Sequence, residues 1–397
     1  MNAISVTRAV KMPDPLRLGR YRKTPELGPS VMFFSGGTAL TATSQVLKTY
    51  THNSVHMVTP FDSGGSSAVL RRAFNMPSIG DLRSRLMALA DETVTGHPDV
   101  YMLFTHRFPL NADNRELLKQ LEAMCAGKHP LLRAVSNPMR QLIRMQLKYF
   151  LDAIPASFDL RGASIGNLIL TGGYLNNNKH LDPIIFLFSK LVGVQGTVRA
   201  IVNDNLHLAT DLEDGSQVVG QHRLTGKEHA PLTSPIKQLY LSADPEKLVP
   251  ANANLRKKNR NLIAKADLIC YPPGSFYTSL IANLLPKGVG QAIAGNLCPK
   301  VFVPNLGHDP EQKGMTLESS IRTLLRYLHE GTDSTYSTEH FLNFVLLDSK
   351  NGEYPGAVPK GMLRKLGIQL IDTRLVSKRS APEYDPELLV ASLLSLT

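Results

Sequence analysis

The chain has 397 residues, of which 43% are hydrophobic and 19% charged, so it can bury a large core. This excludes a disordered tail, a collagen-like repeat and a small disulfide-stapled module. Lysine and arginine number 44 against 33 aspartates and glutamates, and the net charge of +11 favours anionic partners such as phosphates and nucleotides. The chain has no tryptophan, which argues against stacking platforms for single-stranded nucleic acid.

The cysteines and the hydrophobic runs indicate the cellular compartment. The three cysteines, Cys125, Cys270 and Cys298, are far apart and form no C-x-x-C pair, so we expect buried thiols in a reducing cytoplasm. No apolar run approaches the roughly 18 residues of a membrane span, and the amino terminus lacks the apolar segment of a signal peptide. The sequence therefore predicts a cytoplasmic protein without a membrane anchor.

Residues 1–29 differ from the rest of the chain. They are rich in arginine, lysine and proline and show little periodicity, which predicts an extended basic arm. Such an arm either contacts an anionic partner or is a solvated tail. We expect residues 30–397 to form a single α/β domain, with residues 331–397 as its C-terminal extension.

From residue 31 onward, short apolar runs alternate with helical patterns. The predicted strands are residues 31–35, 54–59, 198–202, 206–212, 217–219, 236–241, 268–271, 301–303, 344–347 and 368–371. The predicted helices are residues 39–48, 71–74, 82–90, 117–124, 142–150 and 184–191. A turn at residues 213–215 predicts a hairpin. The alternation predicts a Rossmann-like, mainly parallel sheet with helices on both faces, plus a short antiparallel hairpin.

Two glycines, Gly36 and Gly37, follow the first predicted strand, and Thr38 is expected to cap the helix after them. A turn without side chains lets the backbone approach a phosphate, and the start of a helix favours negative charge. The spacing is neither that of a dinucleotide-binding loop nor that of a P-loop, so an ordinary tight turn explains it equally well.

The loop after the second predicted strand carries a denser set of polar groups. Its candidate site residues are Asp62, Gly64, Gly65, Ser66, Ser67 and, further on, Arg71. Asp62 is predicted to hold a hydroxyl group or a Mg²⁺ ion, and the two serines suit phosphate oxygens. Arg71 is predicted to neutralise phosphate charge. In the structural alternative, Ser66 merely caps a helix and Arg71 is solvated.

Two further loops add candidates. Asp81 is predicted either to cap a helix or to lie in the site, and Arg83 is predicted to turn toward the same cleft. Gly274, Ser275 and Tyr277 follow the predicted strand 268–271. Because ligands of open α/β sheets bind at the carboxyl ends of the strands, we expect all these loops to meet along one edge.

The segment 162–166 matches the G-x-S-x-G turn of α/β-hydrolases around Ser164. No clear apolar strand precedes it, whereas the hydrolase turn follows a strand directly. We therefore interpret this match as chance and assign no nucleophile to it.

Taken in this order, the motifs resemble the CofD/YvcK family. They are Gly36-Gly37-Thr38, residues 62–67 with Leu70 and Arg71, residues 80–83, residues 164–168, and residues 273–279. The resemblance extends from about residue 31 to the C-terminus. Ala39 and the basic arm are similar to the branch called GAK-system CofD-like proteins.

The resemblance implies a Rossmann-like fold, a nucleotide-diphosphate ligand, often Mg²⁺, and commonly a homodimer. It implies that Asp62 positions the acceptor hydroxyl or the metal, and that Arg71 and Arg83 offset developing charge. The residues implied to hold the ligand are Gly36, Gly37, Thr38, Gly64, Gly65, Ser66, Ser67, Asp81, Asn167, Gly274, Ser275 and Tyr277. Proteins of the GAK branch are associated with ATP-grasp and HPr-kinase-like partners.

Two functions therefore compete. The first is a cytoplasmic transferase similar to 2-phospho-L-lactate transferase, in which a nucleotide-activated phospholactyl group passes to a hydroxyl of a deazaflavin. The alternative is a non-catalytic, YvcK-like regulator that binds a nucleotide-sugar. The basic run at residues 255–260 suggests a third class, a nucleic-acid binder, but it is interpreted first as the solvated face of a helix.

Overall fold

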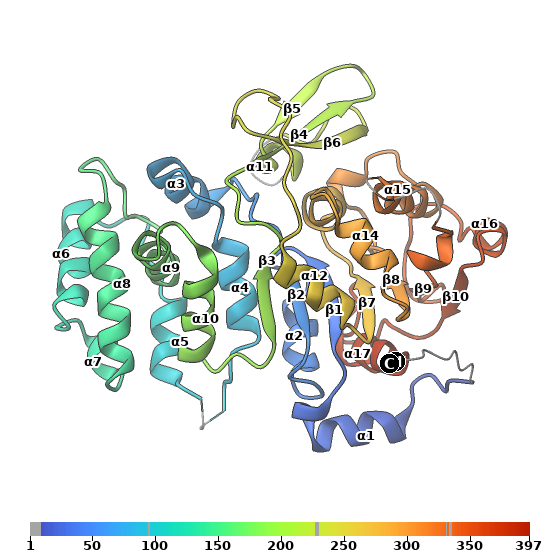
Figure 1. The fold of residues 1–397 in the computed structure, drawn as a ribbon, viewed down its shortest axis with the longest axis horizontal. Helices are drawn as coiled ribbons and strands as arrows, with labels where there is room; N and C mark the ends of the chain where they lie inside the picture. The colour runs from blue at the N-terminus through green and yellow to red at the C-terminus, as the bar shows by residue number, and fades with distance from the viewer. Residues whose placement is uncertain (1–8, 94–95, 227–229, 331, 333–335) are drawn as a thin grey trace.

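A seven-stranded parallel sheet forms the centre of the computed structural model, which describes residues 9–93, 96–226, 230–330, 332 and 336–397. The strand order is β10-β9-β8-β7-β1-β2-β3 (Figure 1). The strands are β1 (Val31–Ser35), β2 (Val55–Val58), β3 (Thr197–Ala200), β7 (Leu268–Tyr271), β8 (Lys300–Phe302), β9 (Phe344–Leu347) and β10 (Gln369–Asp372). All six strand pairings are parallel, which confirms the predicted sheet.

A second, antiparallel sheet stands above the first in Figure 1. It pairs β5 (Gln217–Val219) with β4 (His207–Leu212) and β4 with β6 (Ile236–Ser242). The predicted hairpin is confirmed, but β6 joins it as a third strand. The short helix α11 (Gln221–Leu224) follows β5 directly.

Both faces of the parallel sheet are covered by helices. Val31 and Phe33 of β1 are fully buried in a core shared with α2 (Thr41–Leu47) and α17 (Pro386–Leu394). Met32 and Phe34 lie in a separate core, which includes residues of α14 (Val289–Ala294) and α15 (Leu317–His329). Successive side chains of a strand point to opposite faces, so a continuous apolar run is what a strand buried on both sides requires.

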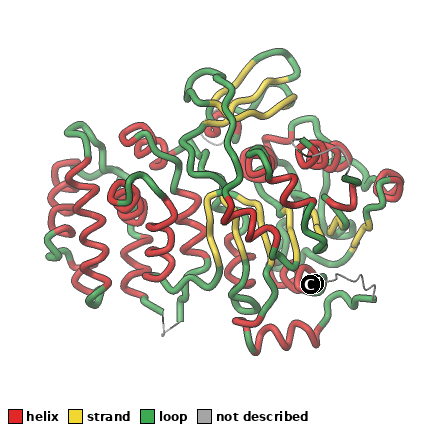
Figure 2. Tube along the Cα trace, in the orientation of Figure 1, coloured by secondary structure: helices red, strands yellow, loops and turns green. Residues whose placement is uncertain are grey.

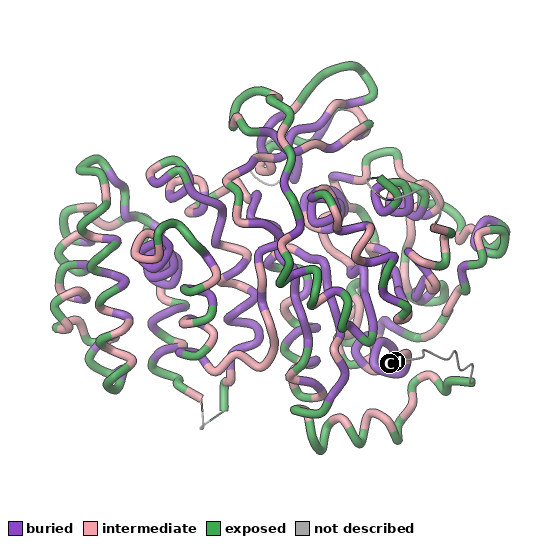
Figure 3. The backbone as a smooth tube through the Cα atoms, viewed as in Figure 1, coloured by how far each residue is buried: buried purple, intermediate pink, exposed green. Residues whose placement is uncertain are grey.

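A third core fills an almost entirely helical lobe beside β3 (Figure 2). Its helices are α3 (Gly65–Phe74), α4 (Gly80–Ala88), α5 (Pro98–Thr105), α6 (Asn114–Cys125), α7 (Pro130–Ala134), α8 (Met139–Ala153), α9 (Ile165–Asn176) and α10 (Leu181–Leu191). Figure 3 shows the buried sides of these helices facing one another and the sheet.

The remaining helical segments lie before the sheet or on the β7–β10 side. They are α1 (Pro15–Lys23), η1 (Pro25–Leu27), α12 (Lys257–Ala264), η2 (Phe276–Ile281), α13 (Ala282–Leu284), η3 (Pro310–Gln312), η4 (Thr338–His340) and α16 (Lys360–Lys365). Among the described helices, none is both long enough and apolar enough to cross a membrane.

The predicted extended arm is wrong for residues 15–23, which form α1, whereas residues 1–8 lie outside the described part. Asp14 caps this helix by accepting the N–H of Arg17 at 3.0 Å, and Pro15 occupies the first turn, where proline is tolerated. Arg17 donates to the carbonyl oxygen of Ser395 at 3.0 Å, and the Tyr21 hydroxyl lies 3.1 Å from that of Thr397. Contacts with the C-terminal segment therefore order a region whose prolines suggested an extended chain.

The interior of β2 contains a histidine that makes stability depend on pH. His56 is fully buried, and its ring stacks on Phe33 with 5.1 Å between ring centres. Burial, and then the positive charge of Arg85, lower its pKa well below the ordinary value. The unfolded chain takes up this proton near pH 6.5 while the folded chain does not, so the stability is lost as the pH falls below about 6.5.

We expect His56 to make the free energy of unfolding fall by about 1.4 kcal/mol per pH unit below that point. The His56→Phe variant, which retains an aromatic ring against Phe33, should show a shallower slope in urea denaturation between pH 6.5 and 5. Burial also lowers the pKa of His207, to about 4. His207 therefore adds to the slope in the same direction, but it does so equally in the wild type and in the variant. Equal slopes for the two proteins would show that His56 is not responsible.

Candidate functional site

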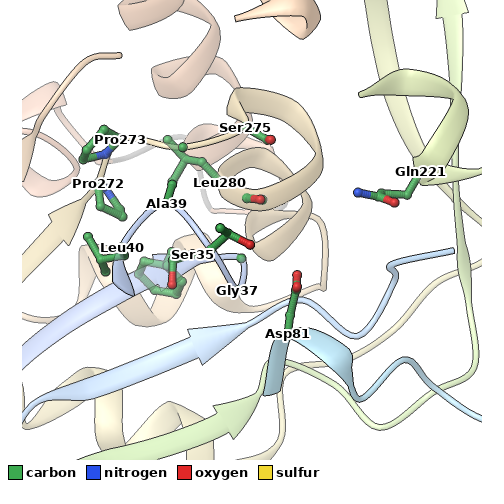
Figure 4. Close-up of a pocket in the computed structure, with 15 residues that line it drawn as sticks. Ser35, Gly37, Ala39, Leu40, Asp81, Gln221, Pro272, Pro273, Ser275 and Leu280 are labelled. Carbon is green, nitrogen blue, oxygen red and sulfur yellow. The ribbon is translucent and has the colours of Figure 1, made fainter. Parts of the chain in front are cut away.

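A groove runs along the carboxyl ends of β1, β2 and β7. Its central cavity is lined by residues 34–40, residues 272–275, Ser279, Leu280, Asp81 and Gln221. Figure 4 shows the Asp81 side chain pointing upward beside Gly37, with Gln221 extending inward from the right and Pro272 and Pro273 on the left. The predicted meeting of loops at one sheet edge is therefore observed.

Two neighbouring cavities extend the groove. One, of about 340 Å³, lies at the starts of α3 and α4 and shares Thr38, Asp81 and Gln221 with the central cavity. The other, of about 580 Å³, shares Ala39, Pro273 and Gly274 and continues to residues 379–386. The groove is thus long enough to offer distinct positions to different parts of one ligand.

The glycines after β1 have a packing role beside any ligand role. A Cβ atom on Gly37 would lie 2.3 Å from Asp81 Oδ1 and 2.9 Å from Asp81 Cα, and one on Gly36 would lie 2.4 Å from Ser279 Oγ. Only glycine lets this loop approach α4 so closely. None of the described hydrogen bonds uses the backbone N–H of Gly37, Thr38 or Ala39. The loop therefore presents amide donors beside the central cavity.

Two predicted helix starts are displaced. The helix after β1 begins at Thr41, so Thr38 does not cap it with its side chain. Helix α4 begins at Gly80, and Asp81 lies in its first turn rather than at the cap. A carboxylate in the first turn interacts favourably with the positive end of the helix dipole, as a carboxylate at the cap does. The cap and the first turn are therefore difficult to distinguish by sequence.

The loop after β2 lies at the edge of the groove. Asp62 Oδ1 accepts the N–H of Gly64 at 3.1 Å, and α3 starts at Gly65, whose φ of 49° favours glycine. Gly64, not Ser66, is the cap of α3. Gly64, Gly65, Ser66 and Ser67 all line the second cavity. Asn167, in the first turn of α9, lines it too and donates to Ser66 Oγ at 3.2 Å.

Arg71 is buried outside the set of groove-lining residues. Its guanidinium donates to the carbonyl oxygens of Phe61, Asp62 and Leu206, and to Asn205 Oδ1 at 2.8 Å. Burial lowers its pKa to about 10. Arg71 therefore holds the Asp62 loop against the start of the antiparallel sheet, and this geometry favours a positioning role over the predicted contact with phosphate.

Tyr277 is also withdrawn from the groove lining. Its N–H and that of Thr278 donate to Glu311 Oε2 at 2.9 and 2.8 Å, and Phe276 N–H donates to Asp309. The carboxylates of residues 309 and 311 thus occupy the start of η2, where Tyr277 was expected to contact the ligand. Burial and the neighbouring Asp309 raise the pKa of Glu311 to about 8. Gly274 and Ser275, by contrast, do line the central cavity.

Arg85 is an important residue that the sequence analysis missed. It is fully buried beneath the glycine turn and donates to Gly36 O at 2.9 Å and to Ser44 Oγ at 2.6 Å. Burial lowers its pKa to about 10, while Asp81 acts in the opposite direction. Arg83 and Arg85 are two residues apart on α4 and so point to different sides of it, and no sequence motif distinguishes the buried one.

The antiparallel sheet contributes a second missed element, α11. His222 lines the second cavity, and its Nδ1 lies 2.7 Å from Ser63 Oγ, beside Asp62. A Cβ atom on Gly220, whose φ is 100°, would lie 2.8 Å from the His222 ring. The imidazole is thereby fixed at the edge of the groove. No local sequence pattern indicates this contact, because it joins residues 159 positions apart.

The G-x-S-x-G match does not form a hydrolase turn. Ser164 is the buried residue before α9, and it does not end a strand, because its described β-pairing is an isolated bridge with Arg107. The described residues also contain no group of three or more His, Cys, Asp or Glu side chains that could hold a metal by themselves. A Mg²⁺ ion bound by one carboxylate and by ligand phosphates needs no such group, and Asp62 suits that arrangement.

The structure thus has a mainly parallel α/β fold with a groove at the carboxyl ends of its strands. The family model described as 2-phospho-L-lactate transferase CofD matches residues 31–376, and the chain belongs to this family. The match begins at the first residue of β1 and ends beyond β10, so it includes the whole parallel sheet.

Several relatives with curated names are gluconeogenesis factors or putative gluconeogenesis factors. The chain is 27% identical to the gluconeogenesis factor of Bacillus subtilis (strain 168) over 380 residues, which are 92% of this chain and 97% of that protein. A relative from Nostoc sp. is 29% identical over 298 residues, but these span only about half, 52%, of its length. A UPF0052-family crystal structure from Bacillus halodurans superposes with a TM-score of 0.67 at 23% identity, covering 92% of this chain and 99% of that one. This likeness establishes the shared fold.

Proposed function

We propose that the groove binds a nucleoside-diphosphate-type ligand and that the protein transfers a phosphorylated group from this ligand to a hydroxyl of an acceptor. One observation carries the proposal: the starts of α3, α4 and α9 and the glycine loop after β1 all line one groove. Amide groups at helix starts are suited to phosphate oxygens, and the dipole of each helix favours negative charge there.

The family supports transfer rather than binding alone, since its model is described as a 2-phospho-L-lactate transferase. In such a reaction the acceptor hydroxyl gives up its proton to water and its oxygen bonds to phosphorus. The bond between phosphorus and the bridging oxygen breaks, and a nucleoside monophosphate leaves with the electron pair of that bond. Asp62, at the edge of the groove, is placed to orient the acceptor hydroxyl or to bind Mg²⁺ together with ligand phosphates. The resemblance further suggests a homodimer and ATP-grasp and kinase-like partners.

The second candidate is a regulator that binds a nucleotide-sugar without turnover. It is favoured by the relatives named gluconeogenesis factors, one of which aligns over nearly its whole length. Both candidates use the same groove, so ligand binding is tested first. Mass spectrometry of the ligand that copurifies with the protein then distinguishes them. A deazaflavin or a nucleotide-activated phospholactate supports the transferase, and an unchanged nucleotide-sugar supports the regulator.

We expect Ala39→Asp to weaken binding of GDP or UDP at least about tenfold, measured by calorimetry with and without Mg²⁺. Ala39 is exposed in the glycine loop and lines two of the three cavities, so a carboxylate there repels phosphate. Gln141→Asp, which adds the same charge to an exposed position in the first turn of α8, is the control and should bind like the wild type. If neither nucleotide binds the wild type, or if Ala39→Asp binds normally, the proposal is wrong.

A further inference from the structure

The second cavity contains a cluster of groups that the nucleoside-diphosphate proposal does not use. Arg83 and Arg107 both line this cavity, and Asn167 lies beside them. Arg107 is exposed and reaches the cavity from the segment after α5, where it also donates to Gly162 O at 2.6 Å. Arg83 comes from the first turn of α4. Helix α4 and the segment after α5, two successive elements of the helical lobe, thus bring two positive charges to one place.

The position of Arg83 is built into the fold. A Cβ atom on Gly166 would lie 2.8 Å from Arg83 Cδ and 2.6 Å from the Phe104 carbonyl oxygen, so only glycine lets the arginine stem cross the start of α9. Burial and then the charge of Arg107 lower the pKa of Arg83 to about 10, while Asp81 opposes this. The buried Nε of Arg83 makes no described hydrogen bond. Like charges held together in this way are stabilised when an anion lies between them.

Asn167 provides an independent observation. Its side chain is 1% exposed, yet it lines the cavity, and its Oδ1 has no described hydrogen-bond partner. Buried polar atoms almost always have a hydrogen-bond partner, so an amide oxygen without one beside a cavity indicates a missing polar partner. The positions of the oxygen and nitrogen of an amide are assigned from their surroundings. If the Asn167 amide is flipped, so that the two atoms exchange places, its NH₂ group faces the cavity and donates to an anion.

We propose that Arg83, Arg107 and Asn167 form a subsite for a second oxyanion, separate from the phosphates at the glycine loop. The proposal rests on the proposed function only in placing both anions in one groove. Asp62 and Asp81 also line this cavity, so the oxyanion lies on the arginine side and leaves the Asp62 side for a hydroxyl or a cation. The groove's ligands therefore include a group that carries a carboxylate or a phosphate away from the nucleoside.

Small anions test the subsite without a nucleoside. The full-length protein is titrated by calorimetry at low ionic strength with inorganic phosphate and with malonate. We expect at least one of them to bind, and Arg83→Gln and Arg107→Gln each to weaken that binding about tenfold or more. A preference for phosphate assigns a phosphorylated group to the subsite, and a preference for malonate assigns a carboxylate.

Asn167→Asp keeps the shape of the side chain but adds a negative charge. It should weaken binding of the same anion at least about tenfold. Arg161→Gln, which changes an exposed arginine paired with Asp159, is the matched control and should bind normally. Because Arg107 is exposed, its variant keeps the test valid even if Arg83→Gln fails to fold. Absence of anion binding, or binding unaffected by Arg107→Gln and Asn167→Asp, overturns the subsite whether or not nucleotides bind elsewhere in the groove.

Discussion

Replacing Arg85 by methionine is expected to lower the free energy of unfolding by about 3 kcal/mol or more and to abolish nucleotide binding. Methionine fills much of the space but donates no hydrogen bond. The carbonyl oxygens of Gly36 and Gly37 and the hydroxyl of Ser44 then lose a donor, and Asp81 loses a nearby positive charge. The glycine loop is fixed by these contacts, so it should lose its shape together with the stability.

Urea denaturation and calorimetry with GDP or UDP measure the two effects separately. Arg72→Met is the matched control, because Arg72 is exposed on α3 and, among the described residues, its side chain donates to Ala68 of its own helix alone, at 3.3 Å. That variant should change the stability by no more than about 0.5 kcal/mol. Wild-type stability in Arg85→Met would show that the buried guanidinium does not hold the loop, and our account of the glycine turn would be incorrect.

The centre of the parallel sheet was predictable because β1, β2, β7 and β8 are buried on both faces. Continuous apolar runs such as those of β1 and β7 distinguish such strands from the surrounding amphipathic helices. The edge that carries the site then follows from topology alone, since the carboxyl ends of parallel strands lie together. This is why Gly36, Ser66, Asp81 and Gly274, dispersed along the chain, could be assigned to one groove.

The roles of individual charged residues were less predictable. Arg71 and Arg83 each follow a glycine-containing turn, yet one is bound to backbone carbonyls and the other lines a cavity. The difference depends on where residues 205–206 pass, and local sequence carries no information about that contact. Tyr277 illustrates the same limit, because Glu311 and Asp309, more than 30 residues away, occupy the helix start that was expected to contact the ligand.

The most distant contributions were missed altogether. Gln221 and His222 reach the groove from the antiparallel sheet, which is inserted between β3 and β7 of the parallel one. Their sequence has the features of an ordinary turn after a hairpin, and only the folding of that sheet over the groove brings them near Ser63. The prediction of an extended arm was wrong at residues 15–23 for a related reason. The segment that orders these residues, at the end of α17, lies at the other end of the chain.

Asp62→Asn is expected to reduce turnover by about a hundredfold or more if the protein is a transferase, while nucleotide affinity without metal changes little. Asparagine keeps the Oδ1 atom that accepts the Gly64 N–H, so the loop should retain its shape and lose only the negative charge. That charge is what a Mg²⁺ ion or an acceptor hydroxyl at this edge requires.

The measurement is release of nucleoside monophosphate from a nucleotide-activated phospholactate with a deazaflavin acceptor, alongside calorimetry with the nucleotide. Asp159→Asn, which changes an exposed carboxylate paired with Arg161, is the control and should turn over normally. Full activity in Asp62→Asn would remove Asp62 from the catalytic groups while leaving the transferase in place. A wild-type protein that binds nucleotide but shows no turnover with any acceptor would contradict the transferase itself, and the same groove would then belong to a regulator, in which Asp62→Asn alters affinity alone.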